Sequence, residues 1–259
     1  MKLVIVQRGI LDDFDENLSC LAAKIKEAAG SGAEMVCLSE YFAGKNISVK
    51  HCKRIIEFLS QLSSKYKIDI VTGNFLFSQP NGTVKEVSAV INKKGKVAGL
   101  QKKVNSYLQK DEEKNKELVL ITSNIGKIII LSQLDAFDDS LEEQLINLEP
   151  DLILMQFSPV SLLELEAIKG LALSRSLGET NVVVGISLIG EDNGDNYIGN
   201  SFVAFQGEIV AEASDKECVM IVEIDSSRFF KYKNLKETVI LPELLKQKFE
   251  HERHLRSGI

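Results

Sequence analysis

Apolar positions recur along the chain with two alternating periods, and this predicts strands and helices in turn. Residues 2–9 and 33–42 are runs of mostly apolar residues, typical of buried strands. Residues 15–30 place apolar side chains three and four positions apart and end at a glycine, which indicates a helix. Residues 48–66 repeat the helical spacing. The chain therefore begins with two strands, each followed by a helix.

The pattern then changes to short strands joined by tight turns. The segments "DIVTGNFLFS", "KEVSAVIN" and "VAGLQKK" are separated by "QPNGT" and "KKGK", and Asn81-Gly82 is a strong hairpin signal. These residues predict an antiparallel meander after the second helix.

The second half of the chain repeats this order. Strands are expected at 127–134, 151–157 and 181–189, with helices at 139–148 and 160–178 between them. A second meander, "NSFVAFQGEIVAEAS" and "ECVMIVEID", follows, and residues from about 230 to 259 read as a helical tail.

Two such halves predict an α/β protein in which two mixed sheets pack face to face. Several strands are almost wholly apolar, as expected when both faces of a sheet are covered. Helices on the outer faces would give a four-layer α-β-β-α sandwich. We expect one domain over residues 1–259, because 44% of the residues are apolar and only 4 are prolines.

Charge and apolar run length exclude several classes of protein. The formal charge of -6 argues against nucleic acid as a partner. The apolar runs are too short for a membrane span, and the N-terminal run is too short for a secretory signal. The four cysteines have no regular spacing, which argues against a disulfide framework. These observations predict a cytoplasmic protein.

A zinc site is an alternative interpretation of the histidines. His251 and His254 in "HERH" would share a helix face, and His51 and Cys52 could in principle complete a zinc site. The HExxH spacing is absent, so we interpret this segment as a charged surface helix and expect no metal and no organic cofactor.

Two strand ends carry charged residues at positions where α/β proteins commonly place active-site groups. Glu40 ends a buried strand, where α/β sheets place ligand sites, and a partly dehydrated carboxylate there could act as a general base. Alternation along the strand ending in Lys102 and Lys103 sends one ammonium inward, where it could stabilise negative charge. An ordinary loop acid and a solvated basic pair remain the alternatives.

An ordered set of segments resembles the nitrilase superfamily of carbon–nitrogen hydrolases. The set comprises "VIVQ", "GAEMVCLSEYF", "GNFLF", "AVINKKGKVAGLQKKVN", "IGKIIIL", "PDLILMQFSP", "LSRSLGETNVVVG", "YIGNSFVAFQGEIVAEA" and "VEIDSSR". The resemblance covers nearly the whole chain and implies the same four-layer sandwich. It also implies a Glu–Lys–Cys triad, in which the thiol attacks an amide or nitrile carbon. Glu40 matches the family's glutamate and Lys103 its lysine, with Asn105 in place of a histidine.

The family's cysteine position falls on Gln133. The family pattern places the thiol seven residues after a glycine, and Gly126 leads to Gln133. Counting back eighteen residues from Asp151 gives Gln133 again, and Asp135 then matches the aspartate that follows the thiol. A carboxamide is not a useful nucleophile, but its donors and acceptor could hydrogen-bond to both Glu40 and Lys103.

Other positions are candidates for accessory roles. Ser132 is one position away, and a one-residue shift along a strand turns a side chain to the opposite face. Leu134 occupies a usually aromatic position, and Glu113 or Glu112 could supply the family's second glutamate. A further family glutamate falls on Gly178, with Glu179 beside it.

The resemblance implies a carbon–nitrogen hydrolase-like protein without thiol-dependent amidase or nitrilase activity. Such a pseudoenzyme would bind a small amide or carboxylate, or a partner protein. The alternatives are an active amide hydrolase that uses Glu40-activated water or Ser132, and a purely structural subunit. The resemblance also implies a homodimer formed through the helices near 140–148 and 160–178 and the C-terminal tail.

Overall fold

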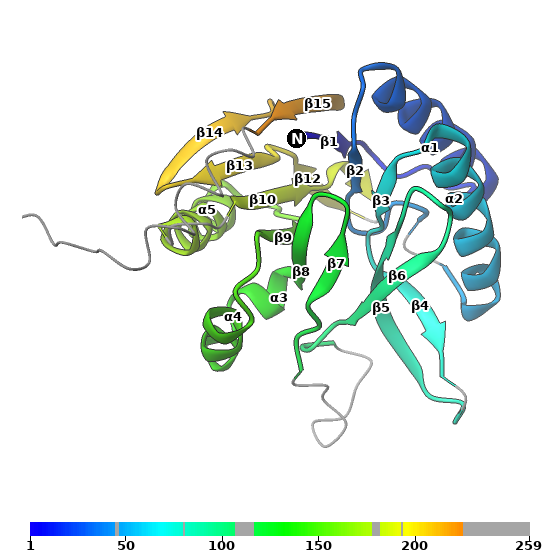
Figure 1. Ribbon diagram of the computed structural model, residues 1–259. Helices are drawn as coiled ribbons and strands as arrows, with labels where there is room; N and C mark the ends of the chain where they lie inside the picture. Colours follow the sequence, from blue (N-terminus) through cyan, green and yellow to red (C-terminus); the bar gives the residue numbers. More distant parts are fainter. Residues whose placement is uncertain (45–46, 80, 107–116, 178–181, 193, 225–259) are drawn as a thin grey trace, which may run out of the picture.

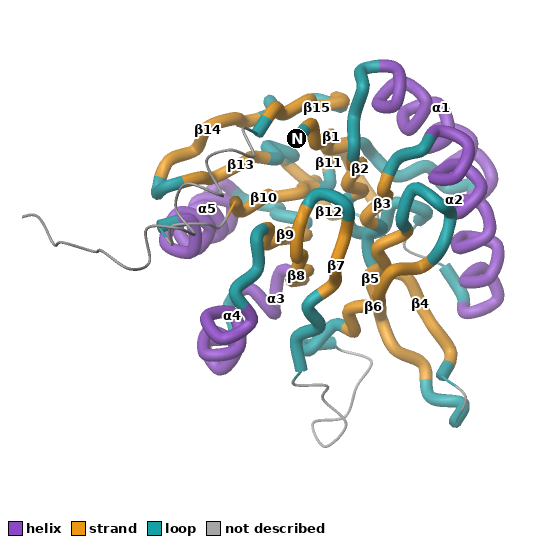
Figure 2. The backbone as a smooth tube through the Cα atoms, in the orientation of Figure 1, coloured by secondary structure: helices purple, strands orange, loops and turns teal. Residues whose placement is uncertain are grey.

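Two β-sheets stack face to face, and helices cover the outer face of each (Figures 1 and 2). The computed structural model describes residues 1–44, 47–79, 81–106, 117–177, 182–192 and 194–224. Helices α1 and α2 lie against one sheet, and α4 and α5 lie on the far side of the other (Figure 1). The structure confirms the predicted four-layer α-β-β-α sandwich of two mixed sheets.

The first sheet has seven strands in the order β15-β1-β2-β3-β5-β4, and β6 also pairs with β5. Its parallel centre, β1 to β3, is flanked by antiparallel strands. The strands are β1 (Lys2–Gln7), β2 (Met35–Leu38), β3 (Asp69–Val71), β4 (Phe75–Ser78), β5 (Val84–Ile91), β6 (Val97–Lys102) and β15 (Cys218–Glu223). The covering helices are α1 (Phe14–Gly30) and α2 (Cys52–Tyr66), the latter preceded by the 3₁₀ turn η1 (Val49–His51).

The second sheet has six strands in the order β14-β13-β10-β9-β8-β7, with a parallel centre from β8 to β10. Its strands are β7 (Ile121–Ser123), β8 (Gly126–Ser132), β9 (Leu152–Phe157), β10 (Val182–Ser187), β13 (Phe202–Phe205) and β14 (Glu208–Glu212). Its helices are α3 (Gln133–Ala136), η3 (Asp139–Leu141), α4 (Glu142–Leu148) and α5 (Leu162–Ser176). A separate hairpin pairs β11 (Ile189–Asp192) with β12 (Asp195–Ile198).

Polar residues set the helix ends. The Asp13 side chain accepts the backbone N–H of Glu16 at the start of α1, and the Ser161 side chain accepts that of Glu164 at the start of α5. Each cap satisfies a donor that the first turn cannot pair internally. Lys67 ends α2 in the left-handed conformation, with φ at 57°.

Apolar contacts fill three interfaces. The layer between the sheets includes Leu3, Cys37, Val71, Ile130 and Val184, all fully or almost fully buried. A second apolar cluster lies between the first sheet and α1 and α2, and a third lies between the second sheet and α3, α4 and α5. Because both faces of each sheet centre are covered, the central strands contain few polar residues.

The structure corrects two predicted strands and adds three elements. The strand expected at 33–42 covers only Met35–Leu38, and the chain leaves the sheet before Glu40. The strand expected at 127–134 ends at Ser132, and Gln133 begins the short helix α3. The strand stops where Ser132 and Asp135 form a capping box that begins α3, with the Asp135 carboxylate accepting the Ser132 N–H. Strand β7 and the β11–β12 hairpin were not anticipated by the sequence analysis. The tail expected at about 230–259 lies outside the described residues.

No helix in the described part of the chain is long and apolar enough to cross a membrane.

Candidate functional site

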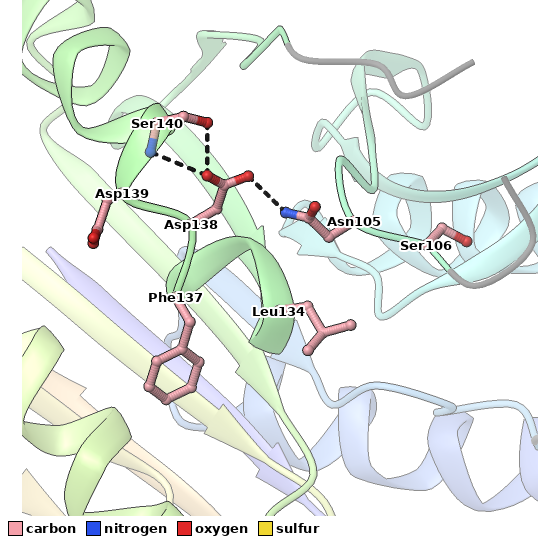
Figure 3. Close-up of a pocket in the computed structure, with 7 residues that line it drawn as sticks. All are labelled: Asn105, Ser106, Leu134, Phe137, Asp138, Asp139 and Ser140. Atoms are coloured by element: carbon pink, nitrogen blue, oxygen red, sulfur yellow. Dashed lines mark hydrogen bonds between the residues drawn. The ribbon is translucent and has the colours of Figure 1, made fainter. Parts of the chain in front are cut away.

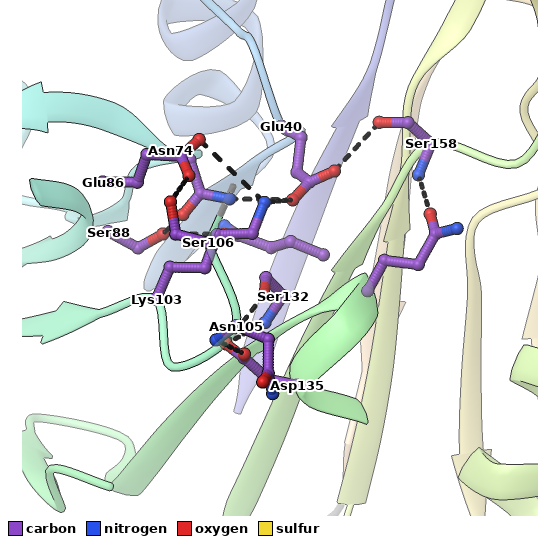
Figure 4. Close-up of polar contacts among 12 residues, drawn as sticks. Glu40, Asn74, Glu86, Ser88, Lys103, Asn105, Ser106, Ser132, Asp135 and Ser158 are labelled. Carbon is purple, nitrogen blue, oxygen red and sulfur yellow. Dashed lines mark hydrogen bonds and ion pairs between the residues drawn. The ribbon is translucent and has the colours of Figure 1, made fainter. Parts of the chain in front are cut away.

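Glu40 lies two residues beyond β2, at the carboxyl end of the parallel strands. Its side chain is held from both sheets (Figure 4): the Asn74 amide donates to Oε1 at 2.7 Å, and the Ser158 hydroxyl donates to Oε2 at 3.1 Å. Asn74 lies between β3 and β4, and Ser158 follows β9 of the second sheet. The carboxylate is 3% exposed, so these two donors replace water as its hydrogen-bonding partners.

A glycine lets the chain that carries Asn74 approach Glu40. A Cβ atom added at Gly73 would lie 1.9 Å from the carbonyl oxygen of Ser39. Only a residue without a side chain fits this crossing, and it delivers Asn74 to the carboxylate. Ser88 on β5 then orients Asn74, donating its hydroxyl to the amide oxygen at 2.8 Å.

Lys103 directly follows β6, and its ammonium lies between two carboxylates (Figure 4). Its Nζ is 3.7 Å from Oε1 of Glu40 and 4.0 Å from Oε1 of Glu86. Lys103 is 7% exposed, whereas the neighbouring Lys102 is only half-buried. The inward and outward arrangement expected from strand alternation is therefore present, with Lys103 as the inward residue.

Burial raises the pKa of the Glu40 carboxyl above its usual range. The Lys103 ammonium opposes this effect, as do the hydrogen bonds from Ser158 and Asn74, while Glu86 adds to it. The burial effect is larger than the opposing effects, so Glu40 holds a proton more readily than an exposed glutamate does.

Gln133 makes different contacts from those expected. Its Oε1 accepts the backbone N–H of Ser158 at 2.9 Å, and its Nε2 makes a short hydrogen bond to Oε1 of Glu164. Within the described chain, these bonds replace the expected ones to Glu40 and Lys103. The carboxamide therefore joins α3 to the β9–α5 connection, and Ser158 stands between Gln133 and Glu40.

Asp135 holds the start of α3 against the segment that follows Lys103. Its carboxylate accepts the Ser132 hydroxyl at 2.7 Å and the backbone N–H groups of Val104 and Asn105 at 3.2 and 2.7 Å. The Ser132 side chain is thus directed to Asp135, and the residue is 4% exposed. Asp135 brings Lys103 and the start of α3 to the same end of the sandwich.

The four cysteines are all free thiols away from this cluster. Cys37 packs between the two sheets, where burial raises the pKa of its thiol. Burial also raises the thiol pKa of Cys52 on α2 and of Cys218 on β15, and Cys20 is exposed on α1. None of these thiols hydrogen-bonds to a site residue in the described part of the chain.

An open pocket of about 490 Å³ adjoins the site (Figure 3). It is lined by Asn105, Ser106, Leu134, Phe137, Asp138, Asp139 and Ser140. Leu134, an accessory candidate from the sequence, thus lines the pocket. Asn105 donates to Asp138 at 3.0 Å, and Ser106 makes a short hydrogen bond to Glu86. Ser106 therefore links the pocket to the charged groups around Lys103.

Sequence reasoning missed four residues of the cluster. Asn74 and Ser158 follow strand ends, so the rule that selected Glu40 could also have selected them. Glu86 and Ser88 share one face of β5, which alternation predicts without indicating what that face meets. Glu113, like Glu112, Gly178 and Glu179, lies outside the described residues.

Metal ligands do not gather in the described parts of the chain. No group of three or more histidine, cysteine, aspartate or glutamate side chains there has the geometry to hold a metal ion. His51 instead accepts the Ser48 N–H at 3.1 Å and stacks on Phe14, while His251 and His254 lie outside the described residues.

Comparison with known proteins identifies the fold. No protein-family model and no curated protein sequence matches the chain. A carbon–nitrogen hydrolase from Helicobacter pylori G27 superposes with a TM-score of 0.79 at 16% identity, covering 92% of this chain and 93% of that chain. Nit3 of Saccharomyces cerevisiae, a member of branch 10 of the nitrilase superfamily, gives 0.78 at 22% identity, covering 93% and 95%.

An enzyme with an active-site cysteine has the same architecture. The amidase of Nesterenkonia sp. AN1 superposes with a TM-score of 0.74 at 13% identity, covering 96% of this chain and 99% of that chain. Since these matches extend over nearly the full length of both partners, the chain has the fold of the nitrilase superfamily of carbon–nitrogen hydrolases.

Proposed function

We propose that this protein is a nitrilase-fold pseudoenzyme that binds a small amide or carboxylate, or a partner protein, without thiol-dependent hydrolysis. The proposal rests mainly on Gln133, which stands at the family's thiol position. Its amide nitrogen is not usefully basic, and both ends of its carboxamide are hydrogen-bonded. A residue held in this way supports the structure but offers no electron pair to an amide carbon.

The surrounding groups support the same conclusion. Each oxygen of Glu40 already accepts a hydrogen bond, from Asn74 and from Ser158. Lys103 is paired with Glu40 and Glu86, which reduces its capacity to stabilise an oxyanion. These contacts describe a site whose charges and donors are satisfied without a reacting group.

One observation favours an active hydrolase as the second candidate. A glutamate whose pKa is raised by burial is suited to general-base catalysis, so Glu40 could activate a water molecule directly. Ser132 is the other alternative nucleophile, but it needs an activating base, and its hydroxyl donates to the Asp135 carboxylate.

Ammonia release separates the two functions. Purified protein is incubated with propanamide, propionitrile and N-carbamoyl-β-alanine, and ammonia is measured. We expect no release above a heat-treated control. Release that Glu40→Gln abolishes would establish the water-activating hydrolase instead. Release that persists in both Glu40→Gln and Lys103→Ala would come from a contaminating enzyme.

The variant Gln133→Cys tests whether the rest of the triad survives. If Glu40 and Lys103 retain a productive arrangement, this variant forms an acyl-enzyme with a small amide, seen as a mass increase of the intact protein. We expect no adduct, because the carboxylate of Glu164 faces position 133 and disfavours a thiolate there.

We further propose a homodimer formed through α4 and α5. Three large apolar side chains on these helices, Ile146, Leu162 and Leu163, are 73%, 70% and 83% exposed to solvent. Grouped apolar side chains with this exposure are typical of protein–protein interfaces. Light scattering should give twice the chain mass, and Leu163→Glu should reduce it to one chain. The four free thiols accord with the proposed cytoplasmic location.

A further inference from the structure

Around Lys103, the described residues place one ammonium group against two largely buried carboxyl groups. One ammonium lies 3.7 Å from the Glu40 carboxyl group and 4.0 Å from the Glu86 carboxylate, and all three side chains are at most 15% exposed. Glu86 alone matches the charge of Lys103. Any charge on Glu40 is then in excess, so an anion entering here meets a cation that is already neutralised.

Glu86 is fixed in this position by the fold. It lies on β5, two residues before Ser88, whose hydroxyl bonds to Asn74 and Gln156 inside the sandwich. Alternation places Glu86 on the same face, and the Ser106 hydroxyl holds its second oxygen. The carboxylate is therefore directed into the site and not towards solvent.

The adjoining pocket has the same sign of charge. Asp138 and Asp139 line it, Leu134 and Phe137 supply an apolar wall, and none of its described lining residues is cationic (Figure 3). The neighbouring segment "YLQKDEEKNK" (107–116) contains three acids and three lysines, so its sequence adds no formal charge. A ligand spanning the pocket and the site would meet carboxylates at both ends.

We propose that this site takes a small amide whose far end is positively charged, that it excludes carboxylates, and that Glu86 determines this specificity. The inference rests on the proposed binding function and narrows it from amide or carboxylate to a cationic amide. A ligand carboxylate would lose its hydration without gaining an unpaired cation in return. A ligand ammonium would instead form ion pairs with the carboxylates of the pocket, while the amide at the other end of the same ligand contacts Glu40 and Lys103.

Three probes with the same propanamide core test the specificity: 3-aminopropanamide, propanamide and succinamate, which are cationic, neutral and anionic at pH 7. Their binding to the intact protein is measured by NMR titration at low and high salt. We expect 3-aminopropanamide to bind about tenfold more tightly than succinamate, with the difference shrinking as salt is added. Equal or tighter binding of succinamate, or binding of none of the three, would overturn the inference.

The variant Glu86→Gln should reverse the preference by freeing the charge of Lys103, so that succinamate gains affinity and 3-aminopropanamide loses it. Glu208→Gln removes the same charge from the exposed start of β14 and should leave the ranking unchanged. If Glu86→Gln does not fold, Asp139→Asn at the pocket replaces it, with an expected severalfold loss for 3-aminopropanamide alone. An unchanged ranking in the folded site variant would contradict the inference.

Failure of the inference is distinguishable from failure of the proposed function. The inference depends on the order of the three affinities, whereas the proposed function depends on ammonia release. A protein that hydrolyses 3-aminopropanamide but does not hydrolyse succinamate would refute the pseudoenzyme and retain the specificity.

Discussion

Exchanging the polar groups of Gln133 and Glu164 provides a strict test of the contact that joins α3 to α5. Gln133→Glu keeps the side-chain volume and the acceptor for the Ser158 N–H, but it replaces the donor to Glu164 with a second carboxylate. A hydrogen bond to a charged group contributes about 2 kcal/mol, and the new repulsion adds to this loss. Since both groups are partly solvated, we expect a destabilisation of about 2–3 kcal/mol.

Glu164→Gln in the same chain should restore the stability. The carboxamide introduced at position 164 can donate to the carboxylate introduced at position 133 and still accept the backbone N–H of Val160, which Glu164 accepts at 2.9 Å. The coupling energy from the double-mutant cycle should be about 2 kcal/mol in favour of the double variant.

Urea unfolding followed by far-UV circular dichroism is the appropriate assay, because the chain contains no tryptophan. The exposed Glu166, also on α5, supplies a matched control: Glu166→Gln should show no coupling to Gln133→Glu. Additivity of Gln133→Glu and Glu164→Gln within about 0.5 kcal/mol would refute the contact and the structural role assigned to Gln133.

Three further predictions concern the remaining contacts of the site. Burial raises the pKa of the Glu40 carboxyl in the folded protein above its pKa in the unfolded chain. Protonated Glu40 therefore contributes stability that is fully present below the unfolded-chain pKa and is lost as pH rises through the folded-protein pKa. Chemical unfolding from pH 4 to 8 should therefore show Glu40→Gln gaining stability relative to the native chain as pH rises, by about 1.4 kcal/mol per unit of pKa difference, and a flat difference would argue against a raised pKa. Asp135→Ala leaves the two backbone N–H groups after β6 without their buried acceptor and should cost about 3 kcal/mol in urea unfolding, with Asp135→Asn losing less; equal losses would show that the carboxylate charge is unimportant. Gly73→Ala places a methyl group 1.9 Å from the Ser39 carbonyl oxygen and should lower the thermal midpoint by several degrees, corresponding to about 3 kcal/mol, whereas an unchanged midpoint would mean that the crossing relaxes freely.

The fold was largely predictable because its elements have distinct periods. Helices α1 and α5 bury one apolar stripe each, and the central strands are covered on both faces, so spacing alone identified them. Short strands such as β7 (Ile121–Ser123) contain too few residues to show a period. The end of β8 was placed two residues late because the apolar residues before Ser132 show no period that marks where the strand stops, whereas the hydrogen bonds between Ser132 and Asp135 begin a helix there.

The site was predictable only in part, since its contacts join distant segments. Glu40 and Lys103 were found by strand-end and alternation rules, and they do lie together. The partner of Gln133 was not found, because an acid in the first turn of a helix is usually explained by the helix dipole, and nothing in the sequence near Glu164 indicates a neighbour 31 positions earlier.

Gln156 on β9 bears on how the sandwich opens. Its amide nitrogen donates to the carbonyl oxygens of Leu38 and Thr72 at 3.3 and 2.6 Å, and its oxygen lies 2.8 Å from the Ser88 hydroxyl, whose one proton it shares with the amide oxygen of Asn74. One side chain of the second sheet thus spans three segments of the first. Separating the sheets at this end would break all the hydrogen bonds of Gln156 at once and leave their buried polar atoms without partners. The strand ends should therefore exchange their amide hydrogens as a single cooperative unit. We therefore expect the end of the molecule that carries Glu40 and Lys103 to be among its slowest-exchanging regions, because the hydrogen bonds of Gln156 hold the two sheets together there.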